Sequence, residues 1–222
     1  VIDLQTGEII SRLTPPQTDP GDRKPVSIAV SQEGIIYAVD RLRGVVDTYD
    51  PQDNWLGVLA DPPGMAGTWR PLAVDVTSDG GVYVTNAGAS ATMIVIAEYS
   101  SIGTFETVFD WDEYNAGSPP SFPAAISTTR NGEMFLADSN NGRVIVMDED
   151  GQAVGIHGVD IGESSLAIPR GSAVDLRGYY YVTHVTGPTL NAWALSTTPA
   201  YFLFSFGSSG SAGGARLFSN PI

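Results

Sequence analysis

One spacing recurs four times along the chain and constrains its fold more than any other feature. A proline is followed by a glycine at +9, an aromatic residue at +12 and a polar residue at +15. The four sets are Pro25–Gly34–Tyr37–Asp40, Pro71–Gly80–Tyr83–Asn86, Pro123–Gly132–Phe135–Asp138 and Pro169–Gly178–Tyr181–His184. A fixed register at this period predicts a repeat architecture.

Each unit predicts four short strands separated by turn residues. The first unit shows them as VSIAV (26–30), IIYAVD (35–40), VVDTYD (45–50) and WLGVLA (55–60). No amphipathic helical stretch of ten or more residues interrupts the units. Consecutive hairpins that cannot each bury both faces alone favour a radial arrangement over a sandwich. We therefore predict an all-β chain, a β-propeller of four-stranded antiparallel blades.

The repeat also predicts the domain organisation. We expect one propeller domain, or a segment of one, over residues 1–222, with complete blades at 25–60, 71–110, 123–158 and 169–207. Residues 1–13 are expected to form the outer strands of a split blade, and 217–222 to start the next blade at Pro221. Two partial blades leave apolar faces uncovered, so we expect further chain or a partner subunit to complete the ring.

Each position of the spacing has a local physical cause. Glycine at +9 suits a hairpin turn with positive φ. Proline is tolerated at the first residue of a strand because that position costs no ladder hydrogen bond. We expect the aromatic residue at +12 to fill the space between blades, and the polar residue at +15 to accept hydrogen bonds from loop N–H groups.

Composition excludes several partners and sites. The net charge is −14, with ten arginines and a single lysine, so the surface repels nucleic acid and anionic lipid. No apolar run approaches the roughly 20 residues that span a bilayer, so membrane insertion is not expected. The absence of cysteine excludes disulfides, thiolate metal sites and cysteine nucleophiles. The acidic, lysine-poor, Ser/Thr/Gly-rich make-up predicts an extracytoplasmic protein, periplasmic or secreted.

The third unit resembles an NHL repeat. The resemblance lies in the opening proline, Asn131-Gly132 at the turn, and the sequence FLAD followed by Asn140, Asn141 and Arg143. Units two and four depart from the pattern, because Asn86 and His184 stand in place of the aspartate. The resemblance implies a propeller that usually closes with six blades. Such propellers serve as binding platforms, as RNA readers and occasionally as enzymes.

Few residues suggest catalysis or metal binding. His184 is a candidate ligand or base, although a hydrogen-bonded capping role is favoured, and His157 is interpreted as structural. Asp110, Asp112 and Asn115 match a calcium loop only in part, because its glycine and bidentate glutamate are missing, so a solvated turn is favoured. No catalytic residue, metal site or cofactor is predicted, and calcium alone is left open.

The remaining candidate is an interaction surface at one end of the blades. By the resemblance, the loops before each first strand and after each second strand share one face, and arginines with aromatic residues are typical of binding sites. The predicted binding residues are Arg41, Arg43, Trp69, Arg70, Asn86, Phe122, Asp138, Asn141, Arg143, Arg170 and His184. For Asp138 and Arg143, a pair that only ties neighbouring loops together is the favoured alternative.

We therefore predict a non-catalytic NHL-type propeller that binds a protein, peptide or glycan through this face. One alternative is a metal-dependent propeller enzyme, lactonase- or lyase-like, with its metal in the central channel. Another is a structural module of a cell-surface or extracellular assembly.

Overall fold

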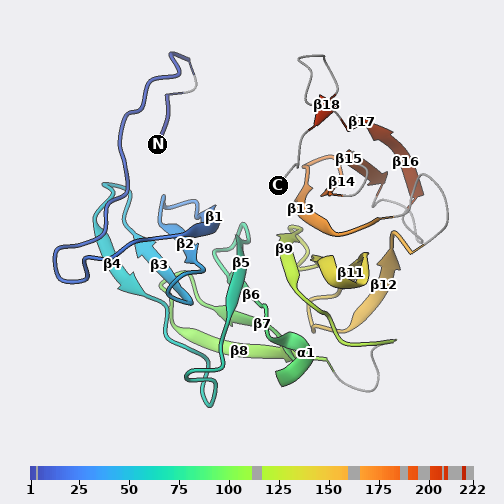
Figure 1. The fold of residues 1–222 in the computed structure, drawn as a ribbon, viewed down its shortest axis with the longest axis horizontal. Coiled ribbons are helices and arrows are strands. Elements are labelled where there is room, and N and C mark those ends of the chain that lie inside the picture. The colour runs from blue at the N-terminus through green and yellow to red at the C-terminus, as the bar shows by residue number, and fades with distance from the viewer. Residues whose placement is uncertain are drawn as a thin grey trace.

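The described chain forms four antiparallel four-stranded sheets arranged as a β-propeller (Figure 1). This computed structural model describes residues 1–3, 5–111, 117–159, 166–185, 190–194, 201–206, 208–209 and 217–218. Blade 1 holds β1 (Pro25–Val30), β2 (Ile36–Asp40), β3 (Val45–Tyr49) and β4 (Trp55–Val58). Blade 2 holds β5 (Pro71–Val76), β6 (Val82–Asn86), β7 (Ile94–Tyr99) and β8 (Phe105–Asp110).

The other two blades repeat this order. Blade 3 holds β9 (Pro123–Thr128), β10 (Met134–Asp138), β11 (Arg143–Met147) and β12 (Ala153–His157). Blade 4 holds β13 (Pro169–Val174), β14 (Tyr179–His184), β15 (Leu190–Ala194) and β16 (Tyr201–Phe206). Each of these four sheets is a simple meander, so the predicted all-β propeller fold is confirmed.

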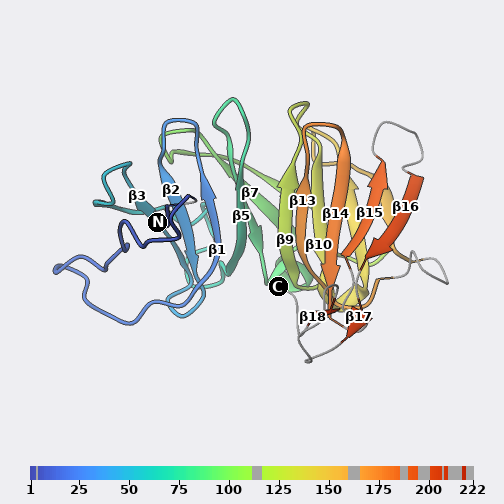
Figure 2. The same ribbon diagram turned by 90° about the horizontal axis from the view of Figure 1, so that it is seen from above.

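The first strand of each blade lies nearest the centre, and the fourth lies outside (Figure 1). Neighbouring inner strands contact one another in the order β1, β5, β9, β13. Figure 2 shows the hairpin turns between first and second strands gathered along one end of the blades. We call this end the turn face. The opposite end, which carries the segments before each first strand and after each second strand, is the loop face.

The sequence spacing is a strand register. Each proline pairs with its own +15 residue across the first hairpin, as Pro25↔Asp40, Pro71↔Asn86, Pro123↔Asp138 and Pro169↔His184. The +9 glycines all have positive φ, from +79° to +96°, as the hairpin requires. In all four blades the register shifts just after the proline. This irregularity, which the sequence did not indicate, is a β-bulge where the strand leaves the loop.

The hydrophobic core is divided into clusters between neighbouring blades. One cluster joins blades 1 and 2 around Tyr37, a second joins blades 2 and 3, and a third joins blades 3 and 4 around Phe135. Tyr83 is half-buried against the second cluster, so the predicted role of the +12 aromatic is confirmed at three blades. Tyr181 instead lies half-buried in blade 4 and donates its hydroxyl hydrogen to Asp175.

Short elements complete the described chain. The polar insert of blade 2 contains α1 (Ala89–Thr92), and blade 3 carries the 3-10 turn η1 (Ser139–Asn141). The two-residue strands β17 (Ser208–Ser209) and β18 (Leu217–Phe218) pair in parallel. No helix in the described ranges is long and apolar enough to cross a membrane.

The N-terminal segment lies outside the four sheets. Its turn carries a single bridge between Ile2 and Ile9 rather than paired strands. Farther along, Leu13 packs against the apolar face of blade 1 that points away from blade 2. The acidic turn at Asp112 and Asn115, a candidate calcium loop, lies outside the described residues.

Candidate functional site on the loop face

The +15 residues cap the inner hairpins from buried positions. Asp40 Oδ1 accepts hydrogen bonds from the backbone N–H groups of Lys24 and Leu42, at 3.0 and 2.9 Å. Asn86 Oδ1 accepts from the Gly88 N–H at 3.0 Å, while its Nδ2 donates to the carbonyl of Ile94. The side-chain amide or carboxylate thus satisfies loop backbone groups, as predicted.

His184 occupies the same position in blade 4 and is also buried. Burial lowers the pKa of His184 below its ordinary value, while hydrogen bonds with Asn191 and the Ala167 backbone act in the opposite direction. A buried imidazole that is hydrogen-bonded to Asn191 and to the Ala167 backbone matches a capping residue.

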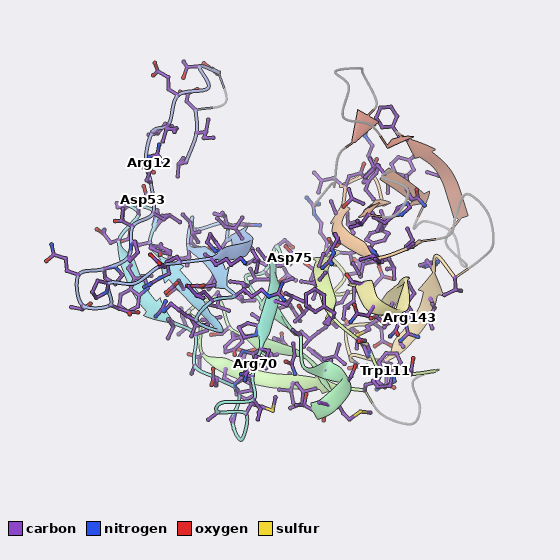
Figure 3. All side chains as sticks on the ribbon, in the orientation of Figure 1. Arg12, Asp53, Arg70, Asp75, Trp111 and Arg143 are labelled. Atoms are coloured by element: carbon purple, nitrogen blue, oxygen red, sulfur yellow. The ribbon has the colours of Figure 1, made fainter. Side chains whose placement is uncertain are left out.

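Asp138 and Arg143 form a buried ion pair at the end of blade 3. Arg143 Nε donates to Asp138 Oδ2 at 2.8 Å, and the same oxygen accepts from Asn141 Nδ2 at 2.8 Å. The guanidinium carbon of Arg143 also lies 5.7 Å from the Trp111 ring centroid (Figure 3). Asn141 and Arg143 also donate to backbone carbonyls of Pro119 and Ser118, in the connection from blade 2 to blade 3. The Asn–Arg pattern of this repeat therefore has a structural cause, because both side chains hold this connection against blade 3.

Arg43 is tied into a second acidic network in blade 1. Its Nη1 donates to both carboxylate oxygens of Asp47, at 3.0 and 3.1 Å, and its Nη2 pairs with Asp19. Asp47 is buried and also accepts from Trp55 Nε1 at 2.9 Å. Most donors of Arg43 are therefore already engaged by the protein itself.

Phe122 lies between two arginines at the mouth of the central channel. The guanidinium carbons of Arg41 and Arg170 lie 5.1 and 5.3 Å from its ring centroid. The three side chains come from the loop after β2, the segment before β9, and the second residue of β13. Blades 1, 3 and 4 thus meet at one half-buried aromatic ring, an arrangement typical of cation–π contacts.

The backbone of Phe122 is strained. Its φ is +65°, a left-handed conformation that bulky residues seldom adopt. Such a conformation costs on the order of 1–3 kcal/mol and persists only where the surroundings enforce it. The surroundings do so here, because the Phe122 carbonyl accepts a hydrogen bond from the Ser139 N–H at 3.1 Å and the ring is held between two guanidinium groups.

The guanidinium groups beside Phe122 keep their hydrogen-bonding capacity. Within the described part of the chain, neither Arg41 nor Arg170 donates a side-chain hydrogen bond or forms an ion pair. Each guanidinium carries five N–H donors in a geometry that suits carboxylates. In a chain of net charge −14, these two arginines concentrate positive charge beside one aromatic ring.

A cleft of about 440 Å³ continues this site between blades 1 and 2. We call it the arginine cleft. Its walls include Arg41, Arg43, Trp69 and Arg70, with Asp61 as its acidic member. Arg41 therefore belongs both to the cleft and to the contact with Phe122. Trp69 is otherwise buried in the core between the two blades.

The structure brings together only some of the predicted binding residues. Arg41, Arg43, Trp69 and Arg70 surround the arginine cleft, and Arg41 continues to Phe122 and Arg170. The other five, four of them buried, are engaged by neighbouring strands and connections of the chain itself; they are Asn86, Asp138, Asn141, Arg143 and His184.

The central channel carries a carboxyl group that sequence reasoning missed. Asp75 on β5 lines this space of about 660 Å³ (Figure 3), and its Oδ2 accepts from Thr128 N and Oγ1 at 2.7 and 2.8 Å. Burial raises the pKa of Asp75, and the bonds from Thr128 only partly offset it. The available signal was an acidic residue within the apolar strand LAVDV.

Across the described residues, no three acidic or imidazole groups converge as metal ligands would.

Comparison with known proteins shows the fold. No family model and no curated protein matches the chain. Virginiamycin B lyase from Staphylococcus aureus is 16% identical with a TM-score of 0.59, over 84% of this chain and 56% of the lyase. A Bacteroides caccae protein of unknown function is 16% identical with a TM-score of 0.68, over 98% of this chain and 71% of that protein. A streptogramin B lyase is 18% identical with a TM-score of 0.62, over 83% of this chain and 55% of that chain.

The chain therefore spans little more than half the length of these two lyases. At such identities the likeness concerns architecture and not activity. The blades, their register and the similar structures agree on one conclusion: the chain is a β-propeller whose described residues form four four-stranded blades.

Proposed function

We propose that this propeller is a non-catalytic binding module of NHL type that recognises a protein, peptide or glycan through its loop face. The observation that carries the proposal is the half-buried Phe122 ring between Arg41 and Arg170. A strained aromatic residue flanked by uncommitted guanidinium groups suits a ligand that pairs a carboxylate with an apolar or ring surface. The arginine cleft extends this surface toward blade 2.

Location and assembly are part of the same proposal. We place the protein outside the cytoplasm because its composition is acidic and lysine-poor, with a net charge of −14. We expect no nucleic-acid partner, because that charge repels phosphate backbones. We also propose that further chain or a partner subunit completes the ring, and the exposed apolar side chains of Val26, Ile28 and Val30 on β1 support this.

The test is a binding screen on arrays of acidic and neutral peptides and glycans. The wild type should bind a subset rich in carboxylates. The double variant Arg41→Gln/Arg170→Gln should lose at least tenfold in affinity for that subset, because two charge-assisted contacts are removed. Arg12→Gln is the matched control, since Arg12 is an exposed arginine on the N-terminal segment (Figure 3). Equal binding by the double variant and the control would refute the proposal.

A channel-centred enzyme is the second candidate. Two lyases share the fold, and Asp75 supplies the channel with a carboxyl group of raised pKa, a feature that also occurs at catalytic acids and bases. Metal analysis and substrate turnover separate the two candidates. A stoichiometric metal, or a reaction abolished by Asp75→Asn and retained by Arg41→Gln/Arg170→Gln, would favour the enzyme.

A further inference from the structure

A cleft of about 580 Å³ opens on the turn face, at the end of the blades opposite the arginines. It lies between the outer strand β4 of blade 1 and the turn that joins β7 to β8 in blade 2. Tyr37, Thr48 and Leu59 lie within its walls, and Glu33 stands at its edge. We call it the turn-face cleft.

The repeat explains why a cleft exists here. Val58 pairs with Asp47 in blade 1 as Val108 pairs with Ala97 in blade 2. In both blades the register of the outer ladder shifts just before Gly57 and Thr107, the residues that precede these valines. Leu59 therefore occupies the position in blade 1 that Phe109 occupies in blade 2.

The contacts of these two residues support the equivalence. Leu59 lies against Gly103 in the outer turn of the next blade, where an added Cβ would be 2.9 Å from its Cδ2. Phe109 lies against Gly151 in the corresponding turn of blade 3.

The two interfaces differ in what fills this position. Between blades 2 and 3, the Phe109 ring stacks on Tyr83, with centroids 6.2 Å apart and planes at 21°. Between blades 1 and 2, the branched Leu59 stands at the same place, and Gly57 replaces the side chain of Thr107. The turn-face cleft beside Tyr37 and Leu59 is therefore the space that the Phe109 ring fills at the next interface.

The surroundings of the cleft are apolar with one acidic group. Leu56, Val58 and Ile102 line it and are exposed, the last by 86%. The carboxylate of Glu33 is exposed at the rim. Burial raises the pKa of Tyr37, and the nearby Glu33 charge raises it further, so the field of this carboxylate reaches into the cleft.

We propose that the turn-face cleft binds a small molecule made of an aromatic ring and a positively charged amine. The ring takes the place that Phe109 holds at the next interface, and the ammonium group lies against Glu33. The volume falls within the range of small-ligand pockets, and a mostly apolar lining with a few polar groups, Glu33 the charged one among them, matches their usual make-up. The proposal is independent of the loop-face function, because the two sites share no residue.

The test uses 2-phenylethylamine as the probe, with binding followed by calorimetry or by NMR on the intact chain. Two analogues examine the chemistry: 3-phenylpropionate keeps the ring and reverses the charge, and 2-cyclohexylethylamine keeps the charge without an aromatic ring. We expect saturable binding of the first compound and at least tenfold weaker binding of 3-phenylpropionate. Equal binding of all three compounds would overturn the proposal.

Two variants examine the location. Leu59→Phe places the ring of blade 2 into blade 1 and should abolish binding by filling the cleft, with an unchanged circular dichroism spectrum. Glu33→Gln should weaken binding about two- to fivefold, as expected for one exposed charge pair. Glu149→Gln, an exposed glutamate in the outer turn of blade 3, is the control and should bind as the wild type does. If Leu59→Phe does not fold, Glu33→Gln against this control decides, and equal affinity of the two refutes the proposal.

Discussion

Asp138 and Asp75 show how much the surroundings of two carboxyl groups can differ within one repeat protein. Asp138 is fully buried beside Arg143 and accepts from Ser121 N as well, so its charge is compensated. Asp75 meets only the uncharged donors of Thr128 and Val76. At this scale Asp138 ties blade 3 to the segment that precedes it, whereas Asp75 joins blade 2 to blade 3 at a cost that depends on pH.

The raised pKa of Asp75 makes a specific pH prediction. The folded state holds this proton more tightly than the unfolded chain, whose aspartates titrate near a pKa of about 3.9. The contribution of Asp75 to stability is therefore fully present below that value and is lost as the pH rises through the folded pKa. Asp75→Asn cannot titrate, so it should gain stability relative to the wild type as the pH is raised from about 4 to 7.

Urea unfolding at a series of pH values measures this difference. Asp22→Asn serves as the control for the chemical change, because Asp22 is exposed on the segment before β1. A pH-independent difference for Asp75→Asn would show that its folded pKa is not raised.

At the scale of elements, local chemistry explains what the sequence could predict. Proline, glycine and the +15 polar residue each act within one hairpin, so their spacing specified the register of β1 with β2, and of its three counterparts. The bulge after each proline and the short α1 carry no comparable signal. They arise where the strand must bend into the loop and where a connection of fixed span must be closed.

The site was less predictable than the strands, for a physical reason. Arg41 and Phe122 lie far apart in the chain, and their contact depends on the distance across the channel, which the packing of several blades determines. The sequence pointed to arginines and aromatic residues on the loop face. It could not separate Arg41, whose guanidinium lies against Phe122, from Arg143, whose Nε donates to Asp138 and whose Nη2 donates to the Ser118 carbonyl.

A glycine pair tests how closely neighbouring blades approach. Gly151 and Gly178 share a φ of +79°, so alanine strains the backbone equally at both, by about 1–2 kcal/mol. At Gly151 the new Cβ would also overlap the Phe109 ring of blade 2, whereas at Gly178 it meets no described atom within 4 Å. Gly151→Ala should therefore cost a further 1–3 kcal/mol, roughly the cost of overpacking a core.

Chemical denaturation of both variants measures the difference. The Gly178→Ala variant is the matched control for backbone strain. Equal destabilisation of the two would mean that Phe109 does not pack on the turn of blade 3.

At the scale of the whole molecule, stability comes from the interfaces between blades. Leu136 is fully buried in the cluster that joins blades 2 and 3. Leu136→Ala should cost about 2–5 kcal/mol, the usual range for such a truncation. Because each blade contributes half of the cluster, hydrogen exchange should accelerate in β5–β8 as well as in β9–β12.

Leu176→Ala is the control, since Leu176 is 86% exposed and should leave exchange unchanged. Faster exchange confined to blade 3 would show that its core is independent of blade 2.

The central claim is that recognition takes place at the loop face, around Phe122. Hydrogen-exchange mass spectrometry of the wild type, with and without the array ligand that binds most tightly, tests it most directly. We predict slower exchange in the loop after β2, at Trp69 and Arg70, and in the segment before β9, with the turn-face hairpins unchanged. The Arg41→Gln/Arg170→Gln variant should show no such protection. Protection confined to the turn face, or equal protection in the variant, would contradict the account.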